Sequence, residues 1–472
     1  MLRDLLKFSI GLGLLICIST ANAADWPTHR GNPQRTGAAD DQAGPTAPHV
    51  LWVHKTREHF IAAPVPGPKA LYVSGLGAFN TARFDALSLD PAAQKRVLWS
   101  KTAPLLKLPT VSAPALVSNR LIFGDGMHQT DGAVLHCVTA DTGLLLWQLP
   151  VPGRLVHLEG AATVVDGRVY LGGGNAGVMC VDSTRATLDG KEQPLEAIQA
   201  VLSKKWEELQ AKYEQEKKVD PDFAIPPSDD SLPKPSPKLL WQQGKDQWHV
   251  DAPVAVVNNR VLVASARLDD EKIGKRMLCA VETSDGKPAW ELPLKLNPWA
   301  GPTVAGNLAL VGCSSIRFDP KLTSGAQGEV VAVDLATGKE KWKKPLGGGV
   351  VSAIAVRGPL AVFTATDGML RAWNVEDGAE RWSYPAGAPF FAGAALSNDV
   401  AYTADLKGVV HAVALSDGKP LWKLDLAQAP EVQAPGMVYG SPALAGGRLY
   451  VATSNLEGNA QQPTVVVCIG AK

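Results

Sequence analysis

The chain has 472 residues and carries 46 basic and 46 acidic side chains, so its formal net charge at neutral pH is zero. This balance gives no electrostatic basis for binding nucleic acid or an anionic membrane surface, and we expect neither as a partner. Apolar residues make up 46% of the sequence, and 45 glycines and 35 prolines supply many turns, as in a large all-β domain.

Residues 1–23 are expected to be a signal peptide and not part of the fold. Two basic residues precede an apolar run over 8–18, and Ala21-Asn22-Ala23 then has the small-x-small pattern of a secretory cleavage site. The apolar run is too short to span a bilayer, so we expect no transmembrane segment. The mature chain, 24–472, is therefore expected to start at Ala24 and to be periplasmic or secreted.

Two kinds of segment recur along the mature chain. In the first, two short apolar runs flank an Asn, Gly or Asp turn, as in 112–124, 251–265, 301–312 and 440–453. In the second, eleven residues begin with a small side chain, have Gly at the seventh position and end in Trp, as in 137–147, 280–290, 332–342, 372–382 and 412–422. Both are hairpin patterns, and together they predict a repeated sheet of four antiparallel strands. Repeats of this length are typical of a β-propeller.

Two independent counts predict eight blades. Innermost strands are expected to start near Ala63, Ala113, Ala161, Ala252, Gly301, Ala353, Ala394 and Ser441. The Trp residues expected to end the blades and dock them on their neighbours are Trp52, Trp99, Trp147, Trp241, Trp290, Trp342, Trp382 and Trp422. Trp52 precedes every innermost strand, whereas the last blade has no Trp after its third strand. We therefore expect the N-terminal strand to complete the last blade and close the ring.

The third blade is interrupted by an insertion over 184–238. Its third strand, 178–182, and its closing strand, 239–241, are separated by a segment in which Pro194 can start a helix. Apolar residues then follow at helical spacing, at Leu195, Ile198, Leu202, Trp206, Leu209 and Tyr213, before a Pro-rich return. Two interpretations are open: the helix lies on the rim of the propeller, or it is an arm that docks another protein.

Five cysteines remain in the mature chain: Cys137, Cys180, Cys279, Cys313 and Cys468. Cys137, Cys180 and Cys468 occupy the repeat position that Ala332 occupies elsewhere, so we interpret them as small buried side chains at the blade contact. Their spacing matches no zinc motif, and we expect neither disulfides nor a thiol metal site.

The repeat resembles that of the quinoprotein-type propeller family, whose blades carry an Ala-x-Asp-x-x-x-Gly-Lys-x-x-Trp docking sequence. Ala332, Asp334, Gly338, Lys339 and Trp342 reproduce it in full. The segment 24–37 also looks like the start of secreted bacterial proteins with these repeats. The resemblance covers nearly the whole mature chain and implies an eight-bladed propeller.

The resemblance implies two classes of function. Dehydrogenases of this family bind pyrroloquinoline quinone on the axis, with Ca²⁺ held by Glu, Asn and Asp, a Trp beneath the ring and, in many, a disulfide between consecutive cysteines. This sequence has no Cys-Cys pair and no Cys-x-x-Cys-His motif for haem. The second class is the non-catalytic propeller subunit of the outer-membrane β-barrel assembly machinery, which binds its partner through surface loops.

Residues just before the innermost strands, with one longer loop, are expected to line an axial mouth. The candidate ligand-binding residues are His59, His157, Glu159, Trp248, His249, Asp251, Trp299 and Arg317. The longer loops also offer Asp125, His128, Arg267, Asp269 and Asp319. The carboxylates either chelate a hard cation or bind backbone N–H groups. The indoles either stack beneath a planar cofactor or pack on the inner strands. We assign no catalytic residue and no metal ligand.

These patterns favour an exported, non-catalytic platform that binds an envelope or extracellular protein or a ligand, without a cofactor. The alternative is a dehydrogenase of an alcohol or sugar that depends on pyrroloquinoline quinone and Ca²⁺.

Overall fold

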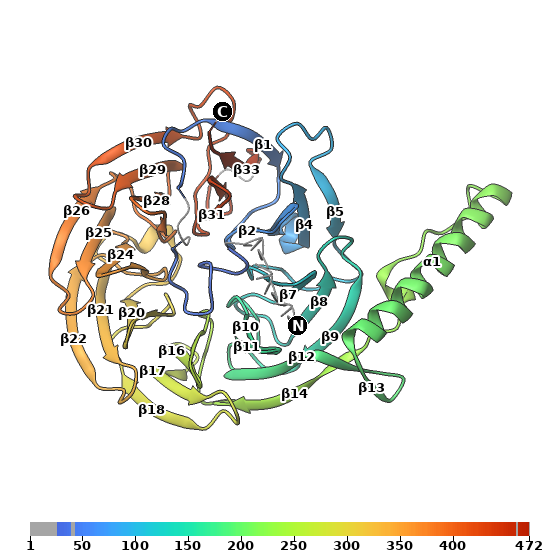
Figure 1. Ribbon diagram of the computed structural model, residues 1–472, viewed down its shortest axis with the longest axis horizontal. Coiled ribbons are helices and arrows are strands. Elements are labelled where there is room, and N and C mark those ends of the chain that lie inside the picture. The colour runs from blue at the N-terminus through green and yellow to red at the C-terminus, as the bar shows by residue number, and fades with distance from the viewer. Residues whose placement is uncertain (1–25, 39–42, 459–460, 472) are drawn as a thin grey trace, which may run out of the picture.

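The computed structural model describes residues 26–38, 43–458 and 461–471. The described strands form eight antiparallel sheets arranged as blades around a central axis (Figure 1), which confirms the predicted all-β propeller of eight blades. The expected signal peptide lies outside the described residues.

Each blade is named here in chain order, with its strands given from the axis outwards. Blades 1 to 4 comprise β2 (Val65–Pro66), β3 (Ala70–Leu76), β4 (Ala82–Ser88), β5 (Val97–Lys101); β6 (Ala115–Val117), β7 (Arg120–Gly124), β8 (Ala133–Thr139), β9 (Leu145–Val151); β10 (Thr163–Val165), β11 (Arg168–Gly172), β12 (Val178–Leu188), β14 (Ser236–Gln243); and β15 (Ala255–Val257), β16 (Arg260–Leu268), β17 (Ile273–Glu282), β18 (Pro288–Pro293). Blades 5 to 8 comprise β19 (Pro302–Ala305), β20 (Leu308–Ser314), β21 (Gln327–Asp334), β22 (Glu340–Gly347); β23 (Ala355–Arg357), β24 (Leu360–Thr364), β25 (Met369–Asn374), β26 (Glu380–Pro385); β27 (Ala395–Leu396), β28 (Val400–Ala404), β29 (Val409–Ala414), β30 (Pro420–Asp425); and β31 (Ala443–Ala445), β32 (Arg448–Ala452), β33 (Thr464–Ile469), β1 (Val50–Thr56).

The ring is closed by the N-terminal strand, as predicted. Strand β1 pairs with β33, and Trp52 lies opposite Cys468. The last blade therefore contains both ends of the propeller, and β1 covers the edge of β33 that would otherwise be unpaired.

A small residue lies opposite the closing Trp in every blade. The pairs are Ala86 with Trp99, Cys137 with Trp147, Cys180 with Trp241, Ala280 with Trp290, Ala332 with Trp342, Ala372 with Trp382, Ala412 with Trp422 and Cys468 with Trp52. The five cysteines of the described residues are free and buried. Cys137, Cys180 and Cys468 thus replace alanine at the position where the sheet accommodates the indole.

Six of the eight closing indoles also donate a hydrogen bond to the next blade. Trp290 of blade 4 donates its Nε1 hydrogen to the carbonyl of Leu335 in blade 5, at 3.0 Å. The same bond to the following blade is made by Trp99, Trp241, Trp342, Trp382 and Trp422. In these blades the closing Trp belongs to one sheet and is hydrogen-bonded to the next.

Two blade contacts use a substitute for this bond. Trp52 and Trp147 are buried with no hydrogen-bond partner for Nε1 in the described part of the chain. The guanidinium of Arg96 lies 4.5 Å from the ring centre of Trp52 and covers it by a cation–π contact. Trp147 instead packs in one apolar cluster with Leu195, Ile198 and Leu202, because the insertion replaces the turn that would have supplied a carbonyl.

The insertion begins as strand and continues as a projecting helix. Strand β12 extends to Leu188, well beyond the expected end of the third strand, and pairs there with both β14 and β13 (Lys191–Pro194), so this sheet has a fifth strand. Helix α1 (Leu195–Val219) is the single α-helix of the described residues. Among those residues, no helix combines the length and the apolar character needed to cross a bilayer.

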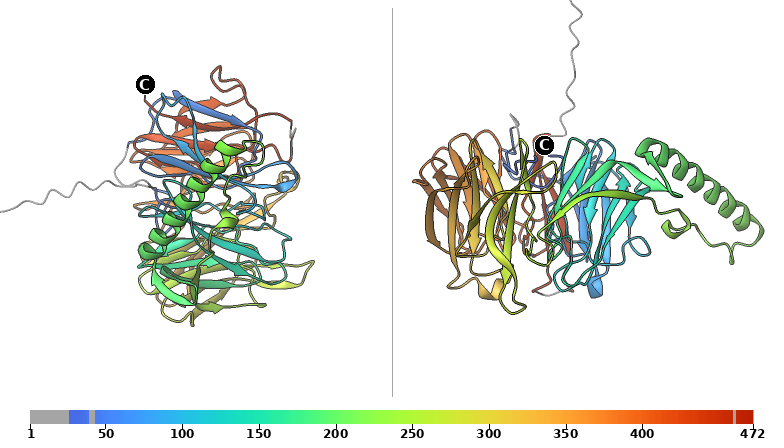
Figure 2. Two further views of the ribbon diagram at one scale, coloured as in Figure 1. Left: turned by 90° about the vertical axis from the view of Figure 1, so that its right-hand side faces the viewer. Right: turned by 90° about the horizontal axis from the view of Figure 1, so that it is seen from below.

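Helix α1 packs on the rim of the propeller only through its first turns. Its buried residues are confined to Leu195, Ile198 and Leu202 in the first turns, which pack against blades 2 and 3. The helix then leaves the ring (Figures 1 and 2), and Trp206, Leu209 and Tyr213 remain partly exposed. The apolar stripe predicted from the sequence is therefore covered over only its first part, because the helix axis diverges from the rim.

Residues 26–38, called here the axial segment, lie along the inner ends of the blades and close the axis (Figure 1). Their carbonyls accept hydrogen bonds from the innermost strands of five blades, through Leu116, Val256, Val304, Val356 and Leu396. Arg35 joins a sixth blade by donating to the carbonyls of Ala161 and Ala162. Unpaired N–H groups at the inner edges of the sheets are thereby satisfied by a single segment.

Candidate functional site

A pocket opens on the axis above the axial segment. Its walls start with small residues that precede the innermost strands, including Ala63, Ala113, Ala161, Ala252 and Ala353. The cavity has a volume of about 160 Å³. His29 of the axial segment also lines it, together with Glu159, Asp251, Trp299, Arg317 and Tyr439. The position of the pocket follows from the fold, because small residues at the inner ends of most blades leave space at the centre.

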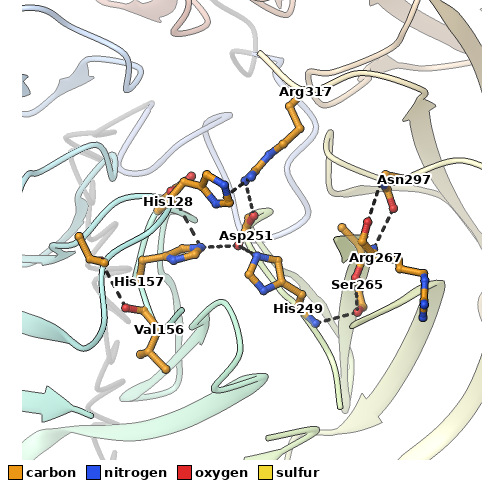
Figure 3. A network of polar contacts seen from close by, with 12 residues as sticks. His128, Val156, His157, His249, Asp251, Ser265, Arg267, Asn297 and Arg317 are labelled. Atoms are coloured by element: carbon orange, nitrogen blue, oxygen red, sulfur yellow. Dashed lines mark hydrogen bonds and ion pairs between the residues drawn. The ribbon is translucent and has the colours of Figure 1, made fainter. Parts of the chain in front are cut away.

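Asp251 is the centre of a polar network on one wall (Figure 3). Its Oδ1 lies 2.8 Å from His157 Nε2 and 3.0 Å from His249 Nε2. Its Oδ2 accepts a hydrogen bond from Arg317 Nη2 at 2.7 Å. Arg317 Nη1 donates to His128 Nδ1 at 2.8 Å. Both oxygens of a nearly buried carboxylate are thus engaged, by His249 of the same segment and by His157 and Arg317 of two other segments.

The charges in this network affect one another. Burial opposes the ionisation of Asp251, but the imidazoles of His249 and His157 outweigh it and hold the pKa of this carboxyl well below its usual range. Burial likewise opposes the charging of His157, but Asp251 outweighs it and raises the pKa of this imidazole. At Glu159, burial and then the charge of Asp251 raise the pKa. The two carboxyl groups therefore differ in acidity although they share one wall.

His128 is kept neutral. Burial and then the positive charge of Arg317 lower the pKa of His128 to about 4. A neutral imidazole can accept the hydrogen bond from Arg317 at Nδ1, which a charged one cannot.

Arg317 also covers an aromatic face. Its guanidinium carbon lies 4.5 Å from the ring centre of Trp299, a cation–π distance. Trp299 is 8% exposed. One guanidinium therefore connects the indole, the carboxylate of Asp251 and the imidazole of His128.

The structure brings together six of the eight residues expected at the mouth. His157, Glu159, His249, Asp251, Trp299 and Arg317 lie in or directly behind the pocket wall. Trp248 packs instead in the core between blades 3 and 4, in a cluster with Cys180 and Trp241. His59 lies between blades 8 and 1, where its Nδ1 accepts a hydrogen bond from the backbone of Asn455 at 3.0 Å. Residues next to each other in the sequence alternate in direction, which separates Trp248 from His249.

The sequence did not indicate the contribution of the axial segment to the site. His29, which lines the cavity, precedes every blade and belongs to no repeat. Its burial and the charges of Arg35 and Arg30 lower its pKa well below the ordinary value. The sequence held only a weak indication of this role. His29, Arg30 and Arg35 follow Trp26 in a segment that has no strand pattern.

The fold and the site define the class of this protein: an eight-bladed β-propeller with an axial pocket closed on one side by its own N-terminal segment. The family model for outer membrane protein assembly factor BamB matches residues 46–206, 232–314 and 317–471. The chain belongs to this family. The match leaves out 207–231, which is the distal part of α1 and the segment that follows it. No curated protein sequence matches the chain.

Solved structures share the fold at low sequence identity. BamB from Moraxella catarrhalis has 12% identity and a TM-score of 0.58, over 90% of this chain and 100% of that one. Quinohemoprotein alcohol dehydrogenase ADHIIG from Pseudomonas putida HK5 has 12% identity and a TM-score of 0.61, over 95% and 81%. A europium-containing methanol dehydrogenase has 13% identity and a TM-score of 0.64, over 94% and 98%. At such identities the likeness concerns the fold alone.

Proposed function

We propose that the chain is an exported, non-catalytic propeller that binds a protein partner in the cell envelope, in a role like that of the outer membrane protein assembly factor in its family. The observation that carries this proposal is the internal pairing of the axial wall. Arg317 binds Asp251 and covers Trp299, so the groups that a substrate or cofactor would use already bind one another.

The donor set of the pocket fits calcium and a planar quinone poorly. Ca²⁺ takes six to eight oxygen ligands. Here Asp251 offers no free oxygen, and its nearest neighbours are the imidazoles of His157 and His249. A planar ring on Trp299 would have to replace the guanidinium of Arg317. Quinone-dependent oxidation is therefore the second candidate.

The distal part of the insertion offers a surface for a partner. Beyond the packed first turns of α1, Val219 is 87% exposed, and Phe223 and Ile225 are each 81% exposed. Apolar side chains this exposed are a feature of binding surfaces, where aromatic and aliphatic residues supply most of the affinity. The segment stands away from the ring (Figure 2), so a partner could reach it without contacting the blades.

A site-specific crosslink tests partner binding. A photo-crosslinking residue at Phe223, in the full-length chain expressed with its signal peptide, is expected to give one dominant envelope-protein adduct. The same residue at Leu421, 53% exposed on blade 7, serves as the matched control and is expected to give none. Equal adducts at the two positions, or only self-adducts at Phe223, would contradict the proposed role.

The second candidate is tested with the purified mature chain, Ca²⁺ and pyrroloquinoline quinone. The proposal predicts no thermal shift and no dye reduction with alcohols or aldoses. Dye reduction that is lost in Glu159→Ala or Asp251→Ala would reverse the ranking of the two functions.

A further inference from the structure

Three imidazoles from three different segments meet in the wall of the axial pocket. His128 follows β7, His157 precedes β10 and His249 precedes β15. One ring nitrogen of each lies within 4.8 Å of the others. The ring centres of His128 and His157 are 6.0 Å apart, and those of His157 and His249 are 5.3 Å apart. The ring planes meet nearly edge to face, at 78° and 69°. Figure 3 shows the three rings grouped around the carboxylate of Asp251.

Two of these rings are fully buried and incompletely satisfied. His157 and His249 are each 0% exposed. His157 Nδ1 and both ring nitrogens of His249 make no hydrogen bond in the described part of the chain. His249 Nε2 lies 3.0 Å from Asp251 Oδ1, in ion-pair range but outside hydrogen-bond geometry. A buried polar atom without a partner costs free energy. Of these three nitrogens, His249 Nε2 is the one on the side of Asp251, and a cation bound there would give it a partner.

The surroundings of the three rings carry the charge that a divalent cation needs. Asp251 lies between His157 and His249, and Glu159 Oε1 lies 3.9 Å from His157 Nε2. The positive charge now facing Asp251 is Arg317, whose side chain is 28% exposed. If this guanidinium swings outward, two carboxylates remain beside three imidazoles, and their formal charge balances that of M²⁺.

We propose that His128, His157 and His249 bind a divalent transition-metal ion of the zinc type, and that Arg317 takes the place of this cation in the metal-free protein. Three imidazoles with an open fourth position form a known type of zinc site, and imidazole suits zinc far better than calcium. The carboxylate of Asp251 then either fills the fourth position or orients the two buried rings.

The movement that binding requires is small. Zn–N bonds of about 2.0–2.1 Å at tetrahedral angles separate two ligand nitrogens by about 3.4 Å. The ligand nitrogens now lie within 4.8 Å of one another, so they must approach by at most about 1.4 Å. His128 can supply this movement, because it is partly exposed and lies in a loop, whereas the other two rings are held in the wall.

The test uses the purified mature chain and Zn²⁺ alone, with affinity measured by competition against a chromophoric chelator. We expect one ion per chain. His128→Ala is the main variant because this residue is partly exposed and its loss leaves the blades intact. It is expected to weaken Zn²⁺ binding by at least about tenfold, the loss that even an outer-shell partner of a metal causes. His49→Ala removes an exposed histidine outside the cluster and is the matched control.

Arg317→Ala provides an effect of the opposite sign. Removal of a like charge from the site is expected to strengthen Zn²⁺ binding by about tenfold or more, whereas a merely structural role of Arg317 would weaken it. If the wild-type chain binds Zn²⁺ no more tightly than His128→Ala does, the proposed metal site is wrong. An unchanged or weaker affinity in Arg317→Ala would overturn the role given to the guanidinium. Neither result depends on whether the crosslinking at Phe223 succeeds.

Discussion

Gly338 of blade 5 lies against the face of Trp290 of blade 4. A Cβ at Gly338 would be 2.5 Å from Trp290 Cγ, closer than carbon atoms approach in proteins. The residue also has φ of +72°, in the left-handed region that favours glycine. The seventh position of the repeat is therefore restricted twice, by its own turn and by the indole of the preceding blade. The same closeness links Gly143 with Trp99 and Gly418 with Trp382.

Gly338→Ala is expected to destabilise the propeller by roughly 2–5 kcal/mol, since it adds overpacking to backbone strain. Gly306→Ala is the matched control in the same blade, because Gly306 has φ of +62° but a methyl group added there would meet no other atom within 4 Å. The control should lose only about 1–2 kcal/mol. Urea denaturation measures both. Equal losses would show that the indole does not restrict this position.

Ile198→Ala is expected to destabilise the contact of α1 with blades 2 and 3 by about 2–5 kcal/mol, because a fully buried side chain is removed. Val201→Ala, in the same helix but 47% exposed, should change stability by no more than about 0.5 kcal/mol. Thermal unfolding and the rate of proteolysis within 203–233 measure the effect. Similar results for the two variants would indicate that the first turns of α1 do not anchor it.

Arg35→Lys is expected to destabilise the protein by at least about 3 kcal/mol. The five N–H groups of the guanidinium reach six acceptors, with Nη2 sharing its two hydrogens among three of them. The acceptors are the carbonyls of His29, Ala161, Ala162 and Val254 and the hydroxyls of Thr28 and Thr163. An ammonium keeps the charge but cannot reproduce this planar fork, so several buried acceptors lose their donor.

The control for this substitution is Arg185→Lys, in a surface pair with Glu192, which should cost less than about 1 kcal/mol. Chemical denaturation compares the two variants. A small loss at Arg35 would mean that the backbone bonds of the axial segment hold it without the guanidinium.

Acid is expected to destabilise the axial segment through His29. The pKa of this imidazole is lowered in the folded state, so below about pH 6.5 the unfolded chain binds a proton that the folded chain does not. Stability from this group is therefore lost as the pH falls below that value, by up to about 1.4 kcal/mol per pH unit. His29→Gln should flatten the decline between pH 7 and pH 5. A difference between wild type and variant that stays constant with pH would contradict this.

Much of the propeller could be predicted because its information is local. The turn at Gly338 and the pairing of Ala332 with Trp342 lie within eleven contiguous residues, and the alternation of a strand orients each of them. The closure of the ring could be predicted by counting strands. The last blade lacked a fourth strand, and the strand that contains Trp52 preceded every blade. The residues near the starts of the inner strands also showed where the pocket would lie.

The pairing inside the pocket could not be predicted in the same way. Arg317 and His128 are 189 residues apart and meet only because blades from opposite parts of the sequence share one axis. Trp248 and His249 are neighbours, yet one joins the core and the other the pocket wall, because the backbone turns them to opposite sides.

The sequence by itself determined the blades, their number and the way the ring closes, since these depend on strand alternation, turn glycines and a small residue opposite each Trp. Only the tertiary structure decided that residues 26–38 close the axis, how far α1 packs, and which side chains meet at the centre. The physical reason is that these contacts join segments with no common repeat, so they cannot be predicted from the spacing of residues along the chain.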